Sequence, residues 1–215
     1  MLATVLDHLA AVFVTLFVVV DPVGISPIFV ALTAHDPPAA RPRQARQGVV
    51  IAGGVLLVFA LGGQELLNLL GITLPAFRIA GGLLLLLLGI DMVMARHSGL
   101  RATTPAEEAE GERRGDISVF PLAVPLIAGP GALTSVMLLM NDAAGVWLRQ
   151  IAVLGVLALV LAIAWGCLVL ATYLVRYLGV TGINVITRVL GLVVAALAVQ
   201  FVLDGLAAVG AIAGA

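Results

Sequence analysis

Six stretches of this chain are long and apolar enough to cross a lipid bilayer, and this feature limits its fold more than any other. A helix needs about 20 mostly apolar residues to cross the ~30 Å hydrocarbon layer. A run such as Leu83 to Leu88 lacks the polar–apolar alternation of a membrane β-strand. The sequence therefore predicts an all-α polytopic membrane protein. The predicted spans are residues 2–34, 47–63, 75–94, 117–140, 150–175 and 184–210.

The composition supports this prediction and excludes several other classes of protein. Hydrophobic residues make up 62% of the 215 residues and charged residues only 11%, whereas soluble domains average about 45–50% and about 25%. The net charge of −1 supplies no basic surface for nucleic acid. Cys167 is the single cysteine, which excludes a disulfide framework and a cysteine-based zinc site, so we expect no metal and no cofactor.

Motifs for catalysis and for ATP hydrolysis are absent from the sequence. It contains no GxxxxGK[ST], HExxH or GxSxG pattern, and these patterns would indicate a P-loop ATPase, a zinc hydrolase or a serine hydrolase. We therefore expect the chain not to be an enzyme. We also expect that any transport through it is not driven by ATP hydrolysis in the same chain.

The placement of the arginines predicts the orientation in the membrane. All eleven basic residues are arginines, and cytoplasmic connections are enriched in basic residues. With six spans, the first, third and fifth connections share one side, while Arg149 is the only clear loop arginine on the other side. We therefore predict an inner-membrane protein with both termini outside (periplasmic) and the charged loop 96–116 in the cytoplasm. The arginines on the predicted cytoplasmic side are Arg41, Arg43, Arg46, Arg96, Arg101, Arg113, Arg114 and Arg176.

The two halves of the chain resemble each other at an offset of 108 residues. That offset pairs residues 21 and 22 with 129 and 130, and it pairs the Gly-Ile-Thr at 71–73 with the Gly-Val-Thr at 179–181. Each half contains three spans, so the second half enters from the opposite side, as in many secondary transporters. The sequence thus predicts two inverted three-helix repeats. The predicted units are residues 1–95, the loop 96–116 and residues 117–215.

Each half carries a cluster of helix-breaking residues in its first span. Prolines remove backbone donors, and the residues before them leave the helical conformation. Unpaired backbone is costly in lipid, so such breaks persist only where they are buried in protein or line a wet cavity. The breaks therefore predict the substrate site. Its residues would be Asp21, Pro22, Gly24, Ser26 and Pro27 in the first half, and Gly129, Pro130, Gly131, Thr134 and Ser135 in the second.

The chemistry expected at each break is that of a helix N-terminus. A new half-helix begins after each break, and its unpaired N–H groups carry partial positive charge that favours a carboxylate or a phosphate. The hydroxyls of Ser26, Thr134 and Ser135 would complete a small polar pocket. A plain proline kink, or a cap near the membrane surface, is the alternative interpretation of the same residues.

Charged residues within the spans are the remaining candidates. Asp21 follows three valines, and the sequence leaves open whether it caps the half-helix, binds a substrate's ammonium group or carries a coupling proton. Arg78 and Arg188 occupy matching places in the third and sixth spans. They either extend to the membrane surface or face the central cavity, where Asp91, Asp204 or a substrate carboxylate would be their charge partners.

The two breaker motifs resemble the signatures of a known family. Residues 21–29 read DPVGISPIF, and residues 121–132 read PLAVPLIAGPGA. They are similar to the first-span and fourth-span signatures of the MarC family of bacterial and archaeal membrane proteins, which is grouped with the LysE-like transporter superfamily. The length, the six-span pattern and the charged middle loop match this family as well. Ser26 stands where asparagine is common in the family's motif.

This resemblance implies an inner-membrane secondary transporter of small solutes, of the type that carries small neutral amino acids such as glycine or alanine. The superfamily analogy favours export. The expected partners are the lipid bilayer and a small-molecule substrate, with H+ or Na+ as a coupling ion. We expect no nucleic-acid partner. The oligomeric state is left open and includes a homo-oligomer. The alternatives are a transporter of another metabolite or drug, a channel, and a non-transporting assembly or regulatory membrane protein.

Overall fold

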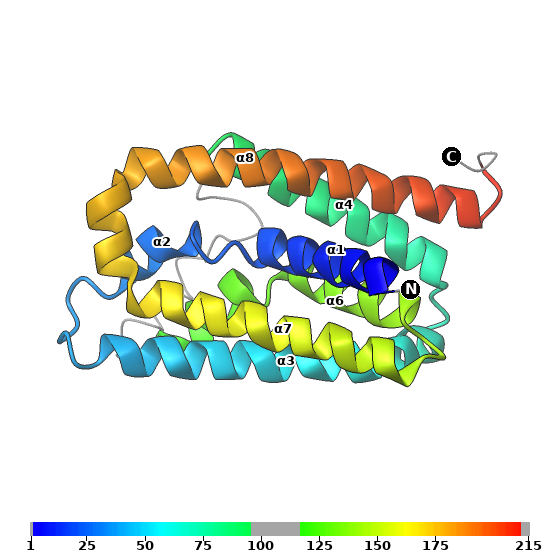
Figure 1. The fold of residues 1–215 in the computed structure, drawn as a ribbon, viewed down its shortest axis with the longest axis horizontal. Coiled ribbons are helices and arrows are strands. Elements are labelled where there is room, and N and C mark those ends of the chain that lie inside the picture. The colour runs from blue at the N-terminus through cyan, green and yellow to red at the C-terminus, as the bar shows by residue number, and fades with distance from the viewer. Residues whose placement is uncertain (1, 96–116, 212–215) are drawn as a thin grey trace.

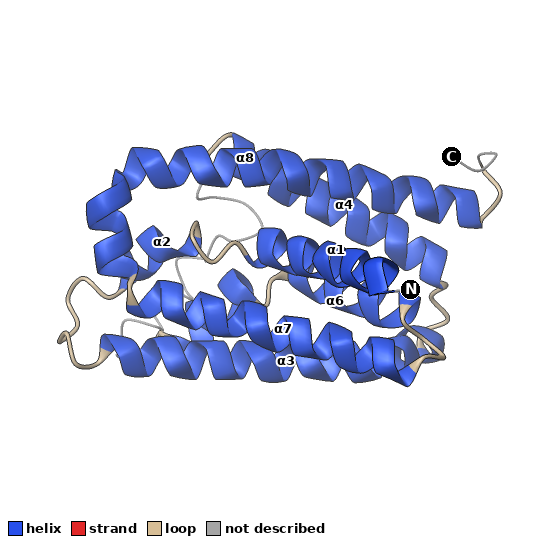
Figure 2. Ribbon diagram, in the orientation of Figure 1, coloured by secondary structure: helices blue, strands red, loops and turns tan. Residues whose placement is uncertain are grey.

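The computed structural model describes residues 2–95 and 117–211, and these residues form helices and no strands (Figures 1 and 2). Within these two ranges, five helices are long and apolar enough to cross a membrane, or six if one bent pair counts as a single span. The predicted all-helical membrane protein is therefore confirmed. The predicted cytoplasmic loop 96–116 lies outside the described residues.

The first span is broken into two helices. α1 (Leu2–Val20) and α2 (Ile25–Leu32) are separated by a turn at residues 21–24. Asp21 has a φ of 51°, in the left-handed region, and asparagine and aspartate are the non-glycine residues that adopt it most readily. The interruption thus falls on the first breaker motif.

The fourth predicted span is also broken. η1 (Ser118–Ile127) leaves helical geometry at Phe120 and Val124, each of which precedes a proline. Contact with the proline ring drives the preceding residue toward extended backbone, which accounts for both interruptions. α6 (Pro130–Asp142) follows η1 at an angle of 59°. Together the two elements cover the length that the sequence predicts for one span.

The other four predicted spans correspond to four long helices, although the predicted span 150–175 runs past the end of one helix into the next. They are α3 (Arg41–Leu69), α4 (Leu74–Val93), α7 (Trp147–Val169) and α8 (Ala171–Ala208). α3 extends beyond the predicted span at both ends, and α8 begins well before predicted residue 184. The early part of α8 turns at Gly179, which has a φ of 66°. Figure 1 shows this part crossing the end of the bundle before the helix runs along it.

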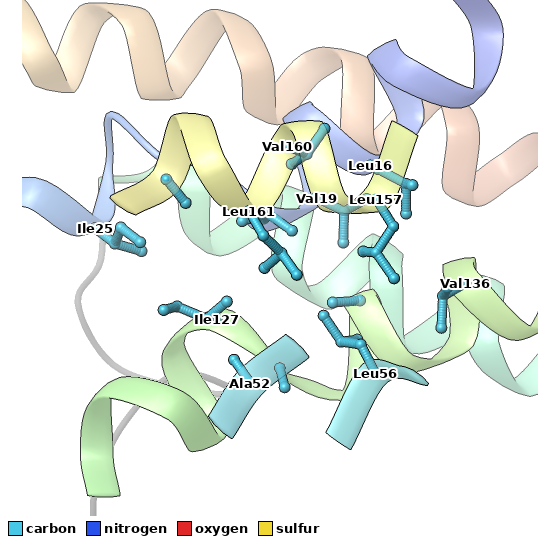
Figure 3. Packing of buried hydrophobic residues seen from close by; sticks show 14 of the residues in the cluster. Leu16, Val19, Ile25, Ala52, Leu56, Ile127, Val136, Leu157, Val160 and Leu161 are labelled. Atoms are coloured by element: carbon cyan, nitrogen blue, oxygen red, sulfur yellow. The ribbon is translucent and has the colours of Figure 1, made fainter. Parts of the chain in front are cut away.

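The broken first span is covered by the unbroken ones. In the most apolar stretch of Asp7–Leu32, 61% is buried inside the protein. The corresponding shares are 28% for α3, 33% for α4, 28% for α7 and 22% for α8. These outer helices expose many leucine, isoleucine and valine side chains. Figure 3 shows the inner packing, in which Leu16 of α1, Leu56 of α3 and Leu157 of α7 meet. The first break therefore lies inside protein, the condition under which irregular backbone is tolerated at membrane depth.

α4 packs closely, along its whole length, against the part of α8 that follows the bend at Gly179. A Cβ on Gly205 would lie 3.0 Å from the carbonyl oxygen of Pro75, at the start of α4. A Cβ on Gly191 would lie 2.9 Å from the backbone nitrogen of Val93, at the end of α4. The two helices are therefore antiparallel (Figure 1), and glycine lets their backbones approach directly.

Candidate functional site

The first half of the candidate site is a buried turn closed by Asp21. The side chain is fully buried, and its Oδ1 accepts a hydrogen bond of 3.1 Å from the backbone N–H of Gly24. A Cβ on Gly24 would lie 2.0 Å from Asp21 Oδ2, so only glycine leaves room for this contact. Asp21 therefore caps the helical turn that leads into α2, which is one of the three roles that the sequence leaves open.

Ser26 and Pro27 lie in the first turn of α2, where a proline is tolerated because its N–H would have no helical partner. Ser26 is fully buried, and its Oγ donates a hydrogen bond of 3.0 Å to the carbonyl oxygen of Pro22. Local bonds of this kind let serine satisfy backbone groups that a break exposes. The hydroxyl of Ser26 thus holds the turn together in this conformation, and its proton is directed to the backbone.

The second half of the candidate site is an uncapped helix N-terminus. Gly129 is extended, with φ −76° and ψ 171°, and Pro130 is the first residue of α6. No side chain within the described ranges caps this terminus. The N–H of Leu133 donates a hydrogen bond of 3.0 Å to the carbonyl oxygen of Gly129. The N–H groups before it have no acceptor within their own helix. The partial positive charge of this terminus is therefore not offset by a capping side chain.

A small cavity adjoins the N-terminus of α6. Its volume is about 10 Å³, roughly the room that one water molecule needs. Three residues predicted from the sequence, Gly129, Pro130 and Gly131, line it. The sequence analysis did not single out the other lining residues, because two of them belong to apolar runs and the remaining three are apolar positions within the second breaker motif. These residues are Val19, Leu88, Leu126, Ile127 and Ala132.

The two breaks lie next to each other in the bundle. A Cβ on Gly131 would lie 3.4 Å from Cγ1 of Val19 and 2.9 Å from Cδ2 of Leu85. Val19 belongs to the last turn of α1 and comes two residues before Asp21. Figure 1 shows α1 ending in the interior of the bundle. The structure thus brings the start of α6 against the end of α1, and with it the two breaker motifs.

Thr134 and Ser135 lie about one turn further along α6 and do not line the cavity. Thr134 fits against α4, where a Cβ on Gly81 would lie 1.9 Å from its Cγ2. Ser135 is fully buried, and its Oγ has no hydrogen-bond partner among the described residues. An unsatisfied buried hydroxyl costs about 1–3 kcal/mol, and a polar solute that reached it would remove this cost.

Apart from Asp21, the charged residues within the spans do not gather at the breaks. Arg78 forms an ion pair with Asp142 at the end of α6, a partner that the sequence analysis did not name. The predicted topology could have indicated this pair, because the third span starts and the fourth span ends on the same side of the membrane. Arg188 is exposed. It lies near the opposite end of the bundle, since Gly191, three residues later, packs against the end of α4. Within the described part of the chain, no ion pair joins Asp91 to either arginine.

Comparison with known proteins finds relatives along almost the whole chain. The family described as MarC family integral membrane protein matches residues 6–209. The chain belongs to the MarC family. A UPF0056 membrane protein of Methanocaldococcus jannaschii is 37% identical to it, over 94% of this chain and 97% of the relative. YhcE of Escherichia coli K12, another UPF0056 membrane protein, is 35% identical, over 90% and 89% of the two chains.

The MarC assignment confirms the resemblance drawn from the two breaker motifs, and it makes the chain an integral multi-pass membrane protein. A third relative, the UPF0056 membrane protein YvbG of Bacillus subtilis, is 33% identical over 91% of this chain and 92% of its own length. No solved structure matches the chain. The MarC match includes both breaks, so the candidate site lies within the part of the chain that matches the family.

Proposed function

We propose that this MarC protein is a secondary transporter of small neutral amino acids, such as glycine or alanine, and not an enzyme. The observation that carries the proposal is the uncapped N-terminus of α6, which is buried in the bundle beside a small cavity. Helix N-termini bind carboxylates through their N–H groups and partial positive charge, and discontinuous helices supply such sites in transporters. The solute's carboxylate would bind the N–H groups of Gly131 and Ala132.

The opposite charge of a zwitterion has a matching partner at the first break. The C-terminal end of α1 carries partial negative charge, and it lies against the N-terminus of α6 through Val19 and Gly131. The carboxyl group of Asp21, two residues after Val19, adds oxygen acceptors on the same side. An ammonium group would therefore be held on the α1 side while the carboxylate is held on the α6 side. This arrangement favours an amino acid over a simple anion.

We further propose that the two halves are inverted repeats that give alternating access to this site. Gly71 and Gly179, which the offset of 108 residues pairs, have nearly equal φ values of 68° and 66°. The first span of each half is broken, and α4 and α8 are antiparallel, as inverted repeats require. The cavity of about 10 Å³ is too small for an amino acid, so binding requires the helices around the breaks to separate. A proton or sodium gradient would drive the cycle, with export as the favoured direction.

We also propose that the protein lies in the inner membrane with both termini outside. Basic residues favour the cytoplasmic side of short connections. Arg41, Arg43 and Arg46 lie at the end of the bundle where α3 begins, opposite both termini (Figure 1). At the end that carries the termini, Arg78 is paired with Asp142 and its charge is offset.

Uptake into liposomes tests the proposed function. Purified protein should take up labelled glycine or alanine saturably, and an imposed proton or sodium gradient should change the rate. Gly131→Leu should abolish uptake, because its side chain would meet Val19, Leu85 and Leu88 beside the α6 N-terminus. Gly155→Leu is the matched control, since among the described residues no atom lies within 4 Å of a Cβ at that position.

The outcomes separate the alternatives. Absence of uptake from protein shown to be folded and inserted would exclude small neutral amino acids and favour another solute or a non-transporting role. Asp21→Asn separates the roles of Asp21, because asparagine also caps helices. Unchanged gradient dependence in this variant would indicate a cap, and lost gradient dependence would indicate a proton carrier.

A further inference from the structure

A second and larger cavity opens between α3, α6 and α7. Its volume is about 530 Å³, within the range of about 300–1,000 Å³ that is typical of small-molecule sites. The lining residues belong to the last third of α3, the end of α6 and the first turns of α7. These segments lie at the end of the bundle that carries both termini (Figure 1).

Amide side chains from all three helices line this cavity. They are Gln64 of α3, Asn141 of α6 and Gln150 of α7. Gln64 accepts a hydrogen bond from Nδ2 of Asn141 and donates one of 3.0 Å to Oδ1 of Asn68. None of the lining residues is ionisable. Amides offer donors and acceptors without net charge, so the wall suits a solute that forms hydrogen bonds and is uncharged or zwitterionic.

Met137 is the cavity-lining residue of α6 that comes closest in sequence to the second break. Met137 lines the cavity and is buried against Gly63, where a Cβ would lie 2.5 Å from its Cε and 2.9 Å from its Sδ. It follows Gly131 by six residues, which is about 9 Å along the helix. Thr134 and Ser135 lie between these two positions. Methionine is unbranched and adopts several rotamers at low cost, so Met137 is suited to be a movable barrier.

We propose that the amide-lined cavity is an access site, in which a small neutral amino acid binds before Met137 moves away from Gly63 and opens the path to the breaks. The identity of the solute rests on the proposed function. The site itself is distinct from the breaks, and its residues are not part of either breaker motif. A lipid acyl chain is the competing occupant, and the amides argue against it because an acyl chain satisfies no hydrogen bond.

Protection of a thiol tests the access site. Cys167→Ser removes the native cysteine, and Ala144→Cys then places a single thiol on the cavity lining. Val146→Cys, in the same connection but outside the lining, is the control. We expect a membrane-impermeant methanethiosulfonate reagent to modify both positions. Alanine should slow the reaction several-fold and saturably at residue 144, but not at residue 146.

Two substitutions test the role of the amides. Gln64→Leu removes the side chain that bonds to Asn141 and Asn68, and Gln150→Leu removes the amide of α7. Each should abolish protection by alanine at residue 144 while leaving the unprotected reaction rate unchanged. The second variant keeps the test decisive if the first one does not fold.

Accessibility of the break tests the barrier. Ser135→Cys, in the Cys167→Ser background, should react slowly with the same reagent because residue 135 is fully buried beyond Met137. Met137→Ala should raise that rate many-fold. Equal reaction rates at residue 135 with and without Met137→Ala would contradict the role of Met137 as a barrier.

The outcomes distinguish this inference from the proposed function. Uptake of alanine without protection at residue 144 would overturn the access site and leave transport standing. Protection without uptake would support the site and contradict transport. Reaction at residue 144 with a membrane-soluble maleimide only would show that the cavity faces lipid, and this result would also overturn the access site.

Discussion

Single glycines decide how closely the broken spans pack. Gly24 leaves space for the carboxylate of Asp21, and Gly81 leaves space for the methyl group of Thr134. In both cases the missing Cβ matters more than backbone freedom, because a Cβ would fall within 2.0 Å of its neighbour. These two positions therefore tolerate no larger residue unless the partner side chain changes too.

The contact between Gly81 and Thr134 predicts a coupled pair of substitutions. Gly81→Ala should lower the stability of the protein by about 1–3 kcal/mol, the usual cost of overpacking. Thr134→Ser removes the Cγ2 atom that a Cβ at residue 81 would meet first, so it should recover part of the loss in the double variant. Thermal unfolding of the four proteins in detergent measures the coupling. Additive effects would argue against this contact.

The capping contact at the first break predicts a second effect. Gly24→Ala should displace the Asp21 carboxylate and remove a cap, at a cost of about 1 kcal/mol for the cap alone. Gly62→Ala is the control, because within the described structure no atom lies within 4 Å of a Cβ there. Melting temperature and alanine uptake should both fall in Gly24→Ala only. An unchanged melting temperature would mean that Asp21 does not stabilise the turn.

The sequence predicted part of this residue-scale detail. Asp21 and Gly24 lie in one motif, and capping was one of the three roles that the sequence left open for Asp21. The different states of Ser26 and Ser135 could not be predicted, because a hydrogen bond to Pro22 and an unsatisfied hydroxyl depend on backbone geometry at each break. Gly81 as the neighbour of Thr134 is a contact between distant segments, and no local pattern marks it.

At the scale of helices, breaks and ends follow proline and glycine more closely than hydropathy. The predicted span 150–175 runs without interruption across Leu170, where α7 ends and α8 begins. Every residue around that boundary is apolar or small, so hydropathy contains no signal for the turn. The bend within α8 did have a signal in the repeat, which pairs Gly179 with Gly71, and both glycines have positive φ.

The bend within α8 predicts opposite effects at two glycines. Gly179→Ala should destabilise the protein by about 1–2 kcal/mol, because an L-residue is strained at φ 66°. Gly155→Ala, inside α7 with open space around it, should be neutral or stabilising, because alanine is the better helix former. Thermal unfolding in detergent compares the two variants directly. Equal losses would point to packing and not to backbone conformation as the cause.

At the scale of the whole molecule, the sequence predicted an all-helical membrane protein but not which of its spans are central. α7 is the most hydrophobic of the candidate spans, yet it lies on the outside, while the first span lies inside with 61% of its most apolar stretch buried. Position in the bundle depends on contacts between segments far apart in the sequence, such as α1 with α6 and α7. The breaker motifs gave the better guide, since irregular backbone has to be covered by protein.

The proposed orientation predicts which end of the bundle meets the outside. In the Cys167→Ser background, Ala144→Cys should react with an impermeant thiol reagent added to intact cells. Pro38→Cys, in the connection at the opposite end, should react only after the cells are permeabilised. The reverse pattern would place the arginine-rich end outside and would contradict the orientation.

The glycine contact between α4 and α8 limits how the two halves can move. It joins the last span of one half to the last span of the other, with backbone against backbone from Pro75 to Val93. Such contacts lose much dispersion energy on separation, so we expect α4 and α8 to stay together when the halves move. A rotation of one half against the other would therefore have the contact between α4 and α8 as its axis. The solute path would then lie to one side of the rotation axis, where the two halves separate the most.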